Sequence, residues 1–497
     1  MLPAGPHHVG FRASWMFDPA RPYHTAFDDG KTYAGPRPIL VNVWYPAAAG
    51  GARLNRAAYL QPPDAPAVHA LAAGLAAHVR GITANEAFGD DESKLSTDAR
   101  QRFAAYLAAP LAAVRDAAPA SGRFPVVLYH AGNGSSYAEN AELCEYLASH
   151  GYVVLGSAFL RPDGTSYNVG EGWRDFDPLI AWAEQQLPFA DTARVAGVGH
   201  SGGAQLMLEY ATSPGRRIRG FALLDTTIDY HGLTLPLHEQ IDELIAHRAA
   251  VTAPLLVVAR PHAIFALVDE LDASDRTYLT VELEHDEFLG HGVTRAAQPD
   301  APADRAPRVL ARYRAVAAAL RAFLGRELNG DRTAAAELTA LASNPLGGDA
   351  PHIEMMPRGA RRPPPYDPST SNAPTPRQLL DLLATHGTAA VIAAARAHHD
   401  REPTSPIYTS SELACALLYD LFVRGQRGDA LALYAYFHQL HPKLVDELLL
   451  WAKLARILDR GEVAEMYTQA AQLFEPERAG ASASPVSRPS SLPPSSS

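Results

Sequence analysis

Ser201 stands in the segment GVGHSGGAQ (197–205), in which four glycines surround a single hydroxyl-bearing side chain. Gly199, Ser201 and Gly203 form the pattern Gly-x-Ser-x-Gly, which follows an apolar run and precedes a helix-forming run. Small neighbours let a serine project from a very tight turn between strand and helix, and the start of the helix favours developing negative charge. The pattern therefore indicates a nucleophilic serine, although a simple glycine-rich connection remains the alternative for this motif taken alone.

A nucleophilic serine needs a histidine as general base and a carboxylate that orients this base. In an open α/β sheet we expect them after the serine, in the order acid and then histidine, at the carboxyl ends of later strands. Asp225 ends the apolar run 219–225, and His285 ends the run 277–285, which is the last predicted strand. The order and spacing predict a catalytic triad of Ser201, Asp225 and His285.

Other histidines and carboxylates compete for these roles. His291 lies six residues after His285 in a glycine-containing loop, but it is not at the end of a predicted strand. His200 adjoins the serine, so we expect its side chain to orient the turn and not to transfer a proton. The strand predicted after Asp225 is followed by no carboxylate before Asp269. His285 and Asp225 are therefore preferred, while a loop-capping role for Asp225 stays open.

A tetrahedral oxyanion requires two backbone N–H donors. Gly202, directly after the serine, is expected to supply one of them. The second is expected from the loop HAGNGSS after the run 124–130, where small residues let the main chain approach the reacting carbonyl. Gly132 is the preferred donor, with Ala131 or Asn133 as substitutes, and an ordinary Gly/Asn turn is the alternative.

Strands and helices alternate over residues 8–328, and this alternation would bring the triad to one edge of a sheet. Repeated alternation predicts an α/β fold with a mostly parallel sheet and helices on both faces. An Ala-rich stretch at 64–118 is expected to be a helical insertion and a candidate lid. The predicted strands are 8–17, 37–46, 124–130, 151–159, 194–200, 219–225, 253–261 and 277–285, and the predicted helices are 138–150, 177–187 and 306–326.

The composition changes after the first 328 residues. Residues 329–376 end in a proline-rich stretch and are expected to be a linker. Residues 377–478 are expected to form an all-α region, in which Ala430 and Ala464, Leu440 and Phe474, and Pro442 and Pro476 are each 34 residues apart. This period is typical of tetratricopeptide repeats. Residues 479–497 are of low complexity and are expected to be disordered.

Composition and charge limit the function classes. The chain has 497 residues, a net charge of −11 and two cysteines, Cys144 and Cys415. This balance argues against nucleic-acid binding, and the cysteine usage argues against a disulfide framework or a thiolate metal site. No cofactor and no metal are predicted. No run of 18 apolar residues and no secretory signal are recognised, so we expect no membrane span and a cytoplasmic location.

The first 328 residues resemble the α/β-hydrolase superfamily, in particular its platelet-activating-factor acetylhydrolase and dienelactone-hydrolase-like branch. That branch also places its acid after the strand that follows the nucleophile helix, which agrees with Asp225. Where the family has His-Gly-x-Gly, this chain has His130-Ala131-Gly132-Asn133. The segments that carry the resemblance are VNVWYPA (41–47), FPVVLYHAGNGSS (124–136), GVGHSGGAQ (197–205), GFALLD (220–225) and HDEF (285–288).

The resemblance implies a metal-independent serine hydrolase that cleaves small-molecule or lipid carboxylic esters through an acyl-serine intermediate. A serine peptidase on the same fold is one alternative. A catalytically lapsed scaffold, whose C-terminal helical repeats bind a protein partner, is another. The intact Ser201–Asp225–His285 order favours an active hydrolase.

Overall fold

The computed structural model places the chain in two compact units. The first comprises Met1–Asp229, Gln240–Ala263 and Leu267–Arg362, and the second comprises the remaining residues. The structure describes residues 2–26, 32–160, 172–213, 215–226, 244–260, 266–343, 352–360, 366–367, 374, 376–401, 411–457 and 461–474.

The first unit is built on one mixed sheet of eleven described strands in the order β11-β10-β9-β8-β7-β5-β6-β2-β1-β4-β3. Neighbouring strands from β6 through β5, β7, β8 and β9 to β10 are parallel, whereas β2 joins β1 and β6 in antiparallel pairs. The strands are β1 (His8–Ala26), β2 (Thr32–Ala47), β3 (Arg53–Asn55), β4 (Pro110–Arg115), β5 (Phe124–His130), β6 (Val153–Gly156), β7 (Ala190–His200), β8 (Ile218–Leu224), β9 (Leu255–Ala259), β10 (Arg276–Thr280) and β11 (His352–Met356). The predicted α/β fold with a mostly parallel sheet is confirmed.

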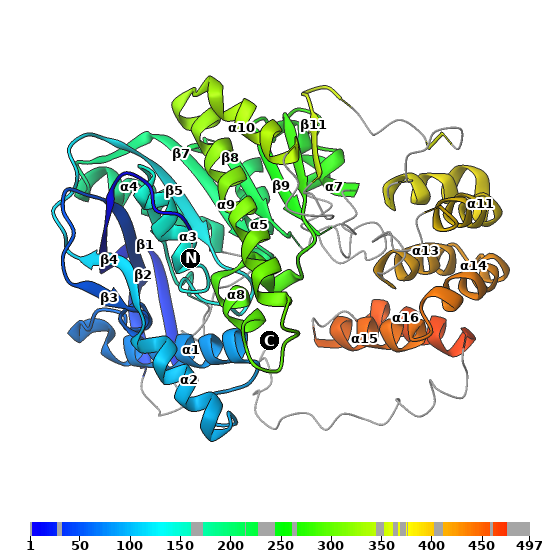
Figure 1. The fold of residues 1–497 in the computed structure, drawn as a ribbon, viewed down its shortest axis with the longest axis horizontal. Helices are drawn as coiled ribbons and strands as arrows, with labels where there is room; N and C mark the ends of the chain where they lie inside the picture. The colour runs from blue at the N-terminus through cyan, green and yellow to red at the C-terminus, as the bar shows by residue number, and fades with distance from the viewer. Residues whose placement is uncertain are drawn as a thin grey trace. The chain divides into compact units, whose positions relative to one another are not determined.

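Helices cover both faces of this sheet, and so its central strands are apolar almost throughout. Helices α3 and α9 pack on one face, and α4 and α5 pack on the other (Figure 1). The α-helices of this unit are α1 (His69–Phe88), α2 (Thr97–Ala108), α3 (Ala141–Ser149), α4 (Phe176–Gln186), α5 (Gly202–Thr212), α7 (Ala266–Asp269), α8 (Gly290–Ala296), α9 (Arg305–Asn329) and α10 (Arg332–Ser343). Short 3-10 helices lie at Arg56–Leu60, Pro66–Val68, Gly172–Asp175, Arg248–Ala250 and His285–Phe288.

Three strands were not predicted: the edge strands β3 and β11, and β4, which lies next to β3. Residues 64–118 are not wholly helical, because the end of this stretch forms β4, which pairs with β1 and β3. Its alanines carry no strand periodicity, and Pro110 occupies the first strand position, where a missing N–H is tolerated. The prediction of a linker over 329–376 is also wrong in part, since α10 packs on α9 and β11 pairs with β10.

The second unit is helical, as predicted. Its helices are α11 (Pro376–His399), α13 (Ser411–Val423), α14 (Arg427–Leu440), α15 (Leu444–Ile457) and α16 (Gly461–Phe474). The bounds of α14 and α16 differ by 34 residues at both ends, which is the spacing seen in the sequence. Ala430 and Ala464, which this spacing relates, are both buried in the shared core of the unit. The proline-rich stretch lies largely outside the described residues, and residues 479–497 lie wholly outside them.

One segment of this unit, residues 378–399, is long and apolar enough to cross a membrane by length and composition alone. Gly387 has φ 78° and ψ 179° within it, so two helices meet there at a kink. Apolar residues on both sides of the kink, among them Leu379, Leu383, Val391 and Ala395, are buried in the helical core. Packing within the unit therefore accounts for part of the apolar character of the segment, of which 39% is buried.

Candidate active site

Ser201 occupies the one-residue turn between β7 and α5. Its φ of 52° and ψ of −120° are costly for a residue with a Cβ atom, and such strain is typically retained where function requires it. Its main-chain N–H donates to the carbonyl of Leu224 at 3.0 Å, which extends the β7–β8 pairing to the turn. The serine is buried, with 8% of its surface exposed.

The two flanking glycines make this turn sterically feasible. A Cβ atom on Gly199 would lie 2.5 Å from the carbonyl carbon of Gly203. A Cβ atom on Gly203 would lie 2.4 Å from the carbonyl oxygen of Ala131. Both contacts are to main-chain atoms, which cannot rotate away as a side chain could. The Gly-x-Ser-x-Gly pattern is therefore a packing requirement of the turn.

The structure brings Ser201, His285 and Asp225 together. Nε2 of His285 lies 3.0 Å from Oγ of Ser201, and Nδ1 of the same ring lies 2.6 Å from Oδ2 of Asp225. The acid thus selects the tautomer that leaves Nε2 free to accept the serine proton. This is the geometry that proton abstraction from a hydroxyl requires.

Asp225 follows β8 directly and is fully buried. Its φ of 43° places it, like the serine, in the left-handed region. The main-chain N–H of Arg260 donates to Oδ1 at 3.2 Å, and Nε of Arg260 lies 3.3 Å from Oδ2. These contacts favour the charged form of a carboxylate that has no access to solvent.

His285 does not end a strand, because β10 stops at Thr280. It is instead the first residue of the 3-10 helix His285–Phe288, which begins with a capping box between Glu284 and Glu287. Asn140 holds the far end of this turn: its side-chain amide donates to the carbonyl of Phe288 at 3.3 Å and accepts from the N–H of Gly290 at 3.1 Å. The imidazole is therefore placed by a capped turn and not by the sheet ladder.

The two predicted oxyanion donors have different surroundings. Gly202 is the first residue of α5, and the first N–H groups of a helix have no partner within it. The N–H of Gly132 donates to both carboxylate oxygens of Glu139, at 3.3 and 3.2 Å. The N–H of Gly132 is thus already used in a hydrogen bond to Glu139, whereas the sequence predicted that it would be an oxyanion donor. The cause is a buried carboxylate seven residues further on, which no motif in the sequence signals.

The competing residues have other partners. Nδ1 of His291 is 2.6 Å from Oε2 of Glu86, a residue of α1. The carboxylate of Asp269 accepts the Tyr278 hydroxyl at 2.7 Å. His200 lies beside the triad, with Nε2 3.2 Å from the carbonyl oxygen of His285.

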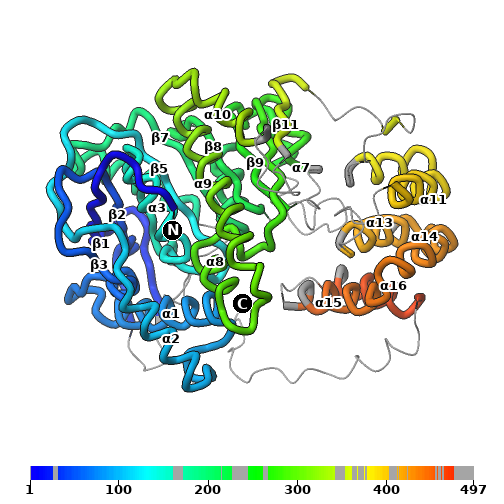
Figure 2. Tube along the Cα trace, in the orientation of Figure 1, coloured from blue at the N-terminus to red at the C-terminus, as the bar shows by residue number. Residues whose placement is uncertain are grey.

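The insertion reaches the segment that follows His285. Helix α1 packs along α8, although more than 200 residues separate their contacting side chains (Figures 1 and 2). Besides the His291–Glu86 pair, Nε of Arg102 donates to Gln298 at 3.2 Å. The insertion is thus packed against α8, the helix that begins five residues after His285, and its role as a lid stays a prediction.

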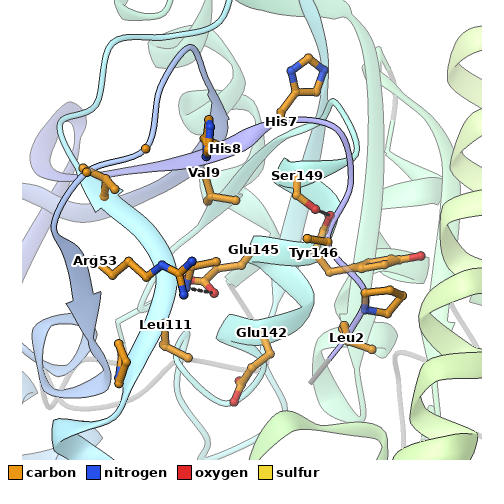
Figure 3. A pocket seen from close by; sticks show the side chains of 17 residues that line it. Leu2, His7, His8, Val9, Arg53, Leu111, Glu142, Glu145, Tyr146 and Ser149 are labelled. Carbon is orange, nitrogen blue, oxygen red and sulfur yellow. Dashed lines mark hydrogen bonds between the residues drawn. The ribbon is translucent and has the colours of Figure 1, made fainter.

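A cavity of about 440 Å³ lies apart from the triad. It is enclosed by the N-terminal segment, β4 and α3, and Figure 3 shows Leu2, His8, Leu111, Glu142 and Glu145 around it. No triad residue lines it. Among the described residues there is no group of three or more His, Cys, Asp or Glu side chains that could hold a metal ion.

Comparison with known proteins was made for the sequence and for the fold. No protein-family model and no curated protein matches the chain. One solved structure that is similar is a ferulic acid esterase from Streptomyces cinnamoneus, with a TM-score of 0.42 and 18% sequence identity. The match covers 66% of this chain and 92% of that one. The serine turn lies directly after the central strand β7 and before α5, which is the strand–turn–helix context that a Gly-x-Ser-x-Gly nucleophile requires.

Proposed function

We propose that this chain is a serine hydrolase that cleaves carboxylic esters through an acyl-serine intermediate. One observation carries the proposal: the imidazole of His285 is hydrogen-bonded to Ser201 at 3.0 Å and to Asp225 at 2.6 Å. A serine hydroxyl becomes an activated nucleophile when a histidine accepts its proton and a buried acid orients that histidine, and a scaffold has no physical need for that arrangement.

The reaction follows from these contacts. Nε2 of His285 takes the proton of the Ser201 hydroxyl as its oxygen attacks the ester carbonyl, and Asp225 stabilises the imidazolium that forms. The same imidazolium then gives this proton to the departing alcohol. In the second half, His285 activates a water molecule that releases the acid and returns the serine to its resting form.

The helix behind the nucleophile contributes to stabilisation of the oxyanion. The N–H of Gly202 and the positive end of the α5 dipole both favour negative charge close to Ser201. The second donor would come from the loop after β5, by a main-chain N–H other than the one that Gly132 directs to Glu139. We assign the chain to the acetylhydrolase and dienelactone-hydrolase-like branch on the sequence segments that resemble it, and its substrate to small-molecule or lipid esters.

The test compares the wild-type protein with Ser201→Ala on p-nitrophenyl acetate. Removal of the nucleophile is expected to lower kcat by several orders of magnitude without loss of folding. A fluorophosphonate probe is expected to label the wild type and not the variant. Wild-type activity in Ser201→Ala would overturn the proposal. Turnover of peptide amides with little turnover of the ester would identify a peptidase instead.

A further inference from the structure

A second buried carboxylate lies beside the nucleophile turn, and the proposed mechanism does not use it. Glu139 precedes α3 and has none of its surface exposed. The Tyr129 hydroxyl donates to its Oε1 at 2.6 Å, and the N–H of Gly132 donates to both of its oxygens. Nδ1 of His200 lies 3.7 Å from the same Oε1. The carboxylate thus connects the loop after β5 with the residue that precedes Ser201.

His200 extends this connection to the catalytic histidine. Its Nε2 lies 3.2 Å from the carbonyl oxygen of His285, and the centroids of the two rings are 4.8 Å apart. The main-chain N–H of His291 donates to the carbonyl of Glu139 at 3.2 Å, so the segment after the catalytic turn is held by the same residue. Glu139 therefore contacts the surroundings of Ser201 and of His285 together.

The charges of the pair support these contacts. Burial raises the pKa of Glu139, but the neighbouring imidazole of His200 outweighs this effect, so the pKa falls below its ordinary value. Burial lowers the pKa of His200, but Glu139 raises it, as do Asp225 and Asp286, and the pKa rises above its ordinary value. In a protonated imidazole both nitrogens are donors. His200 can then face Glu139 with Nδ1–H while Nε2–H donates to the His285 carbonyl.

We propose that Glu139 is a positioning residue of this active site: its carboxylate holds the Gly132 main chain and the His200 ring, and through His200 the main chain of His285, in place around Ser201. The inference rests on the proposed function. Reacting groups must be held closely, since a displacement of about 1 Å costs on the order of 100-fold in rate.

The chain offers a matched control for a variant of Glu139. Glu145 lies in α3, is buried, and accepts a tyrosine hydroxyl, that of Tyr59, at 2.5 Å. It also accepts main-chain N–H groups, those of Ala112 at 2.8 Å and Ala113 at 3.0 Å. Both carboxylates are therefore buried and satisfied in the same way. Only Glu139 is next to the triad.

The experiment measures kcat and KM on p-nitrophenyl acetate, the rate of fluorophosphonate labelling and the thermal unfolding of Glu139→Gln and Glu145→Gln. Glutamine keeps the shape and one acceptor oxygen but removes the charge. Glu139→Gln is expected to lower kcat and the labelling rate about 10- to 100-fold with little change in KM. Glu145→Gln is expected to keep the wild-type kcat, even if its melting temperature falls as much as that of Glu139→Gln.

If Glu139→Gln does not fold, Tyr129→Phe replaces it, with Tyr59→Phe as its control, because each removes one hydroxyl donor from one of the two carboxylates. A several-fold lower kcat in Tyr129→Phe alone supports the inference. If the variant near Glu139 and its control near Glu145 have equal kcat values, the inference about Glu139 is overturned and the proposed function is left intact. A wild-type protein that neither hydrolyses the ester nor reacts with the probe overturns the proposed function itself, and the inference with it.

Discussion

The carboxylate of Asp225 touches both the ring of His285 and the main chain of Arg260. Its Oδ2 is 2.6 Å from Nδ1 of the histidine, and its Oδ1 accepts the Arg260 N–H at 3.2 Å. Both neighbours are donors, so both oxygens must be acceptors. An amide at this position would turn its NH₂ group toward one donor or the other.

Asp225→Asn is therefore expected to lower kcat about 10⁴-fold, because the tautomer with a proton on Nδ1 loses its acceptor. The measurement is steady-state hydrolysis of p-nitrophenyl acetate, with circular dichroism to show that the fold is retained. A folded variant with kcat close to that of the wild type would show that another group orients the histidine.

Gly203→Ala is expected to destabilise the protein by about 3 kcal/mol or more and to abolish activity, because the new methyl group would meet the Ala131 carbonyl oxygen at 2.4 Å. Gly81→Ala is the control: Gly81 lies within α1 and has nothing within 4 Å of the added atom. That substitution is expected to stabilise by up to about 1 kcal/mol through helix propensity. Thermal unfolding of both variants checks the pair, and a stable, active Gly203→Ala would contradict the turn geometry.

We expect the buried side chain of His130 to make the folded protein less stable in acid. Burial lowers its pKa to about 4 in the folded chain, against an ordinary value of 6.5. Between pH 6.5 and pH 4, His130 is protonated in the unfolded chain but stays neutral in the folded chain. The contribution of His130 to the free energy of unfolding is therefore fully present above pH 6.5. It decreases by about 3 kcal/mol as the pH falls to 4.

The comparison is between the wild type and His130→Asn in urea unfolding at pH 7.5 and pH 4.5. The free energy of unfolding of the variant is expected to change less between the two pH values, by about 2.5 kcal/mol, because asparagine does not titrate. Carboxylates contribute to both proteins and cancel. The same pH dependence of the free energy of unfolding in the wild type and in His130→Asn would show that the His130 ring is not held neutral in the folded chain.

His291→Ala separates the two candidate bases. His291 is buried and paired with Glu86, so its loss is expected to destabilise by about 2 kcal/mol while kcat stays near the wild-type value. His285→Ala is expected to lower kcat by several orders of magnitude. The opposite order of kcat values in the two variants would make His291 the base.

Much of the first unit could be predicted from its sequence because its central strands are buried on both faces. Such strands are continuous apolar runs, and the runs at 124–130 and 194–200 coincide with β5 and with the end of β7. The triad residues were found by the same reasoning, since they follow such runs in a fixed order. Ser201, Asp225 and His285 meet as predicted, and their catalytic role stays a proposal.

The sheet edges and the surroundings of the triad could not be predicted in this way. Strands β3, β4 and β11 are short and partly exposed, so they lack the apolar runs that mark the centre. Glu139 reaches Gly132 and His200 only through the tertiary fold, and no local pattern records that approach. The tetratricopeptide assignment also stays a prediction, although the 34-residue offset recurs in the helix bounds.

The triad is assembled from parts that leave the ribosome at different times. Ser201 and His285 are 84 residues apart, and translation at about 5 to 20 residues per second separates their appearance by roughly 4 to 17 s. During that interval the nascent polypeptide carries a hydroxyl with no base to activate it. If the proposed function holds, newly made chains are inert toward esters until β10 and the capped turn after it have folded.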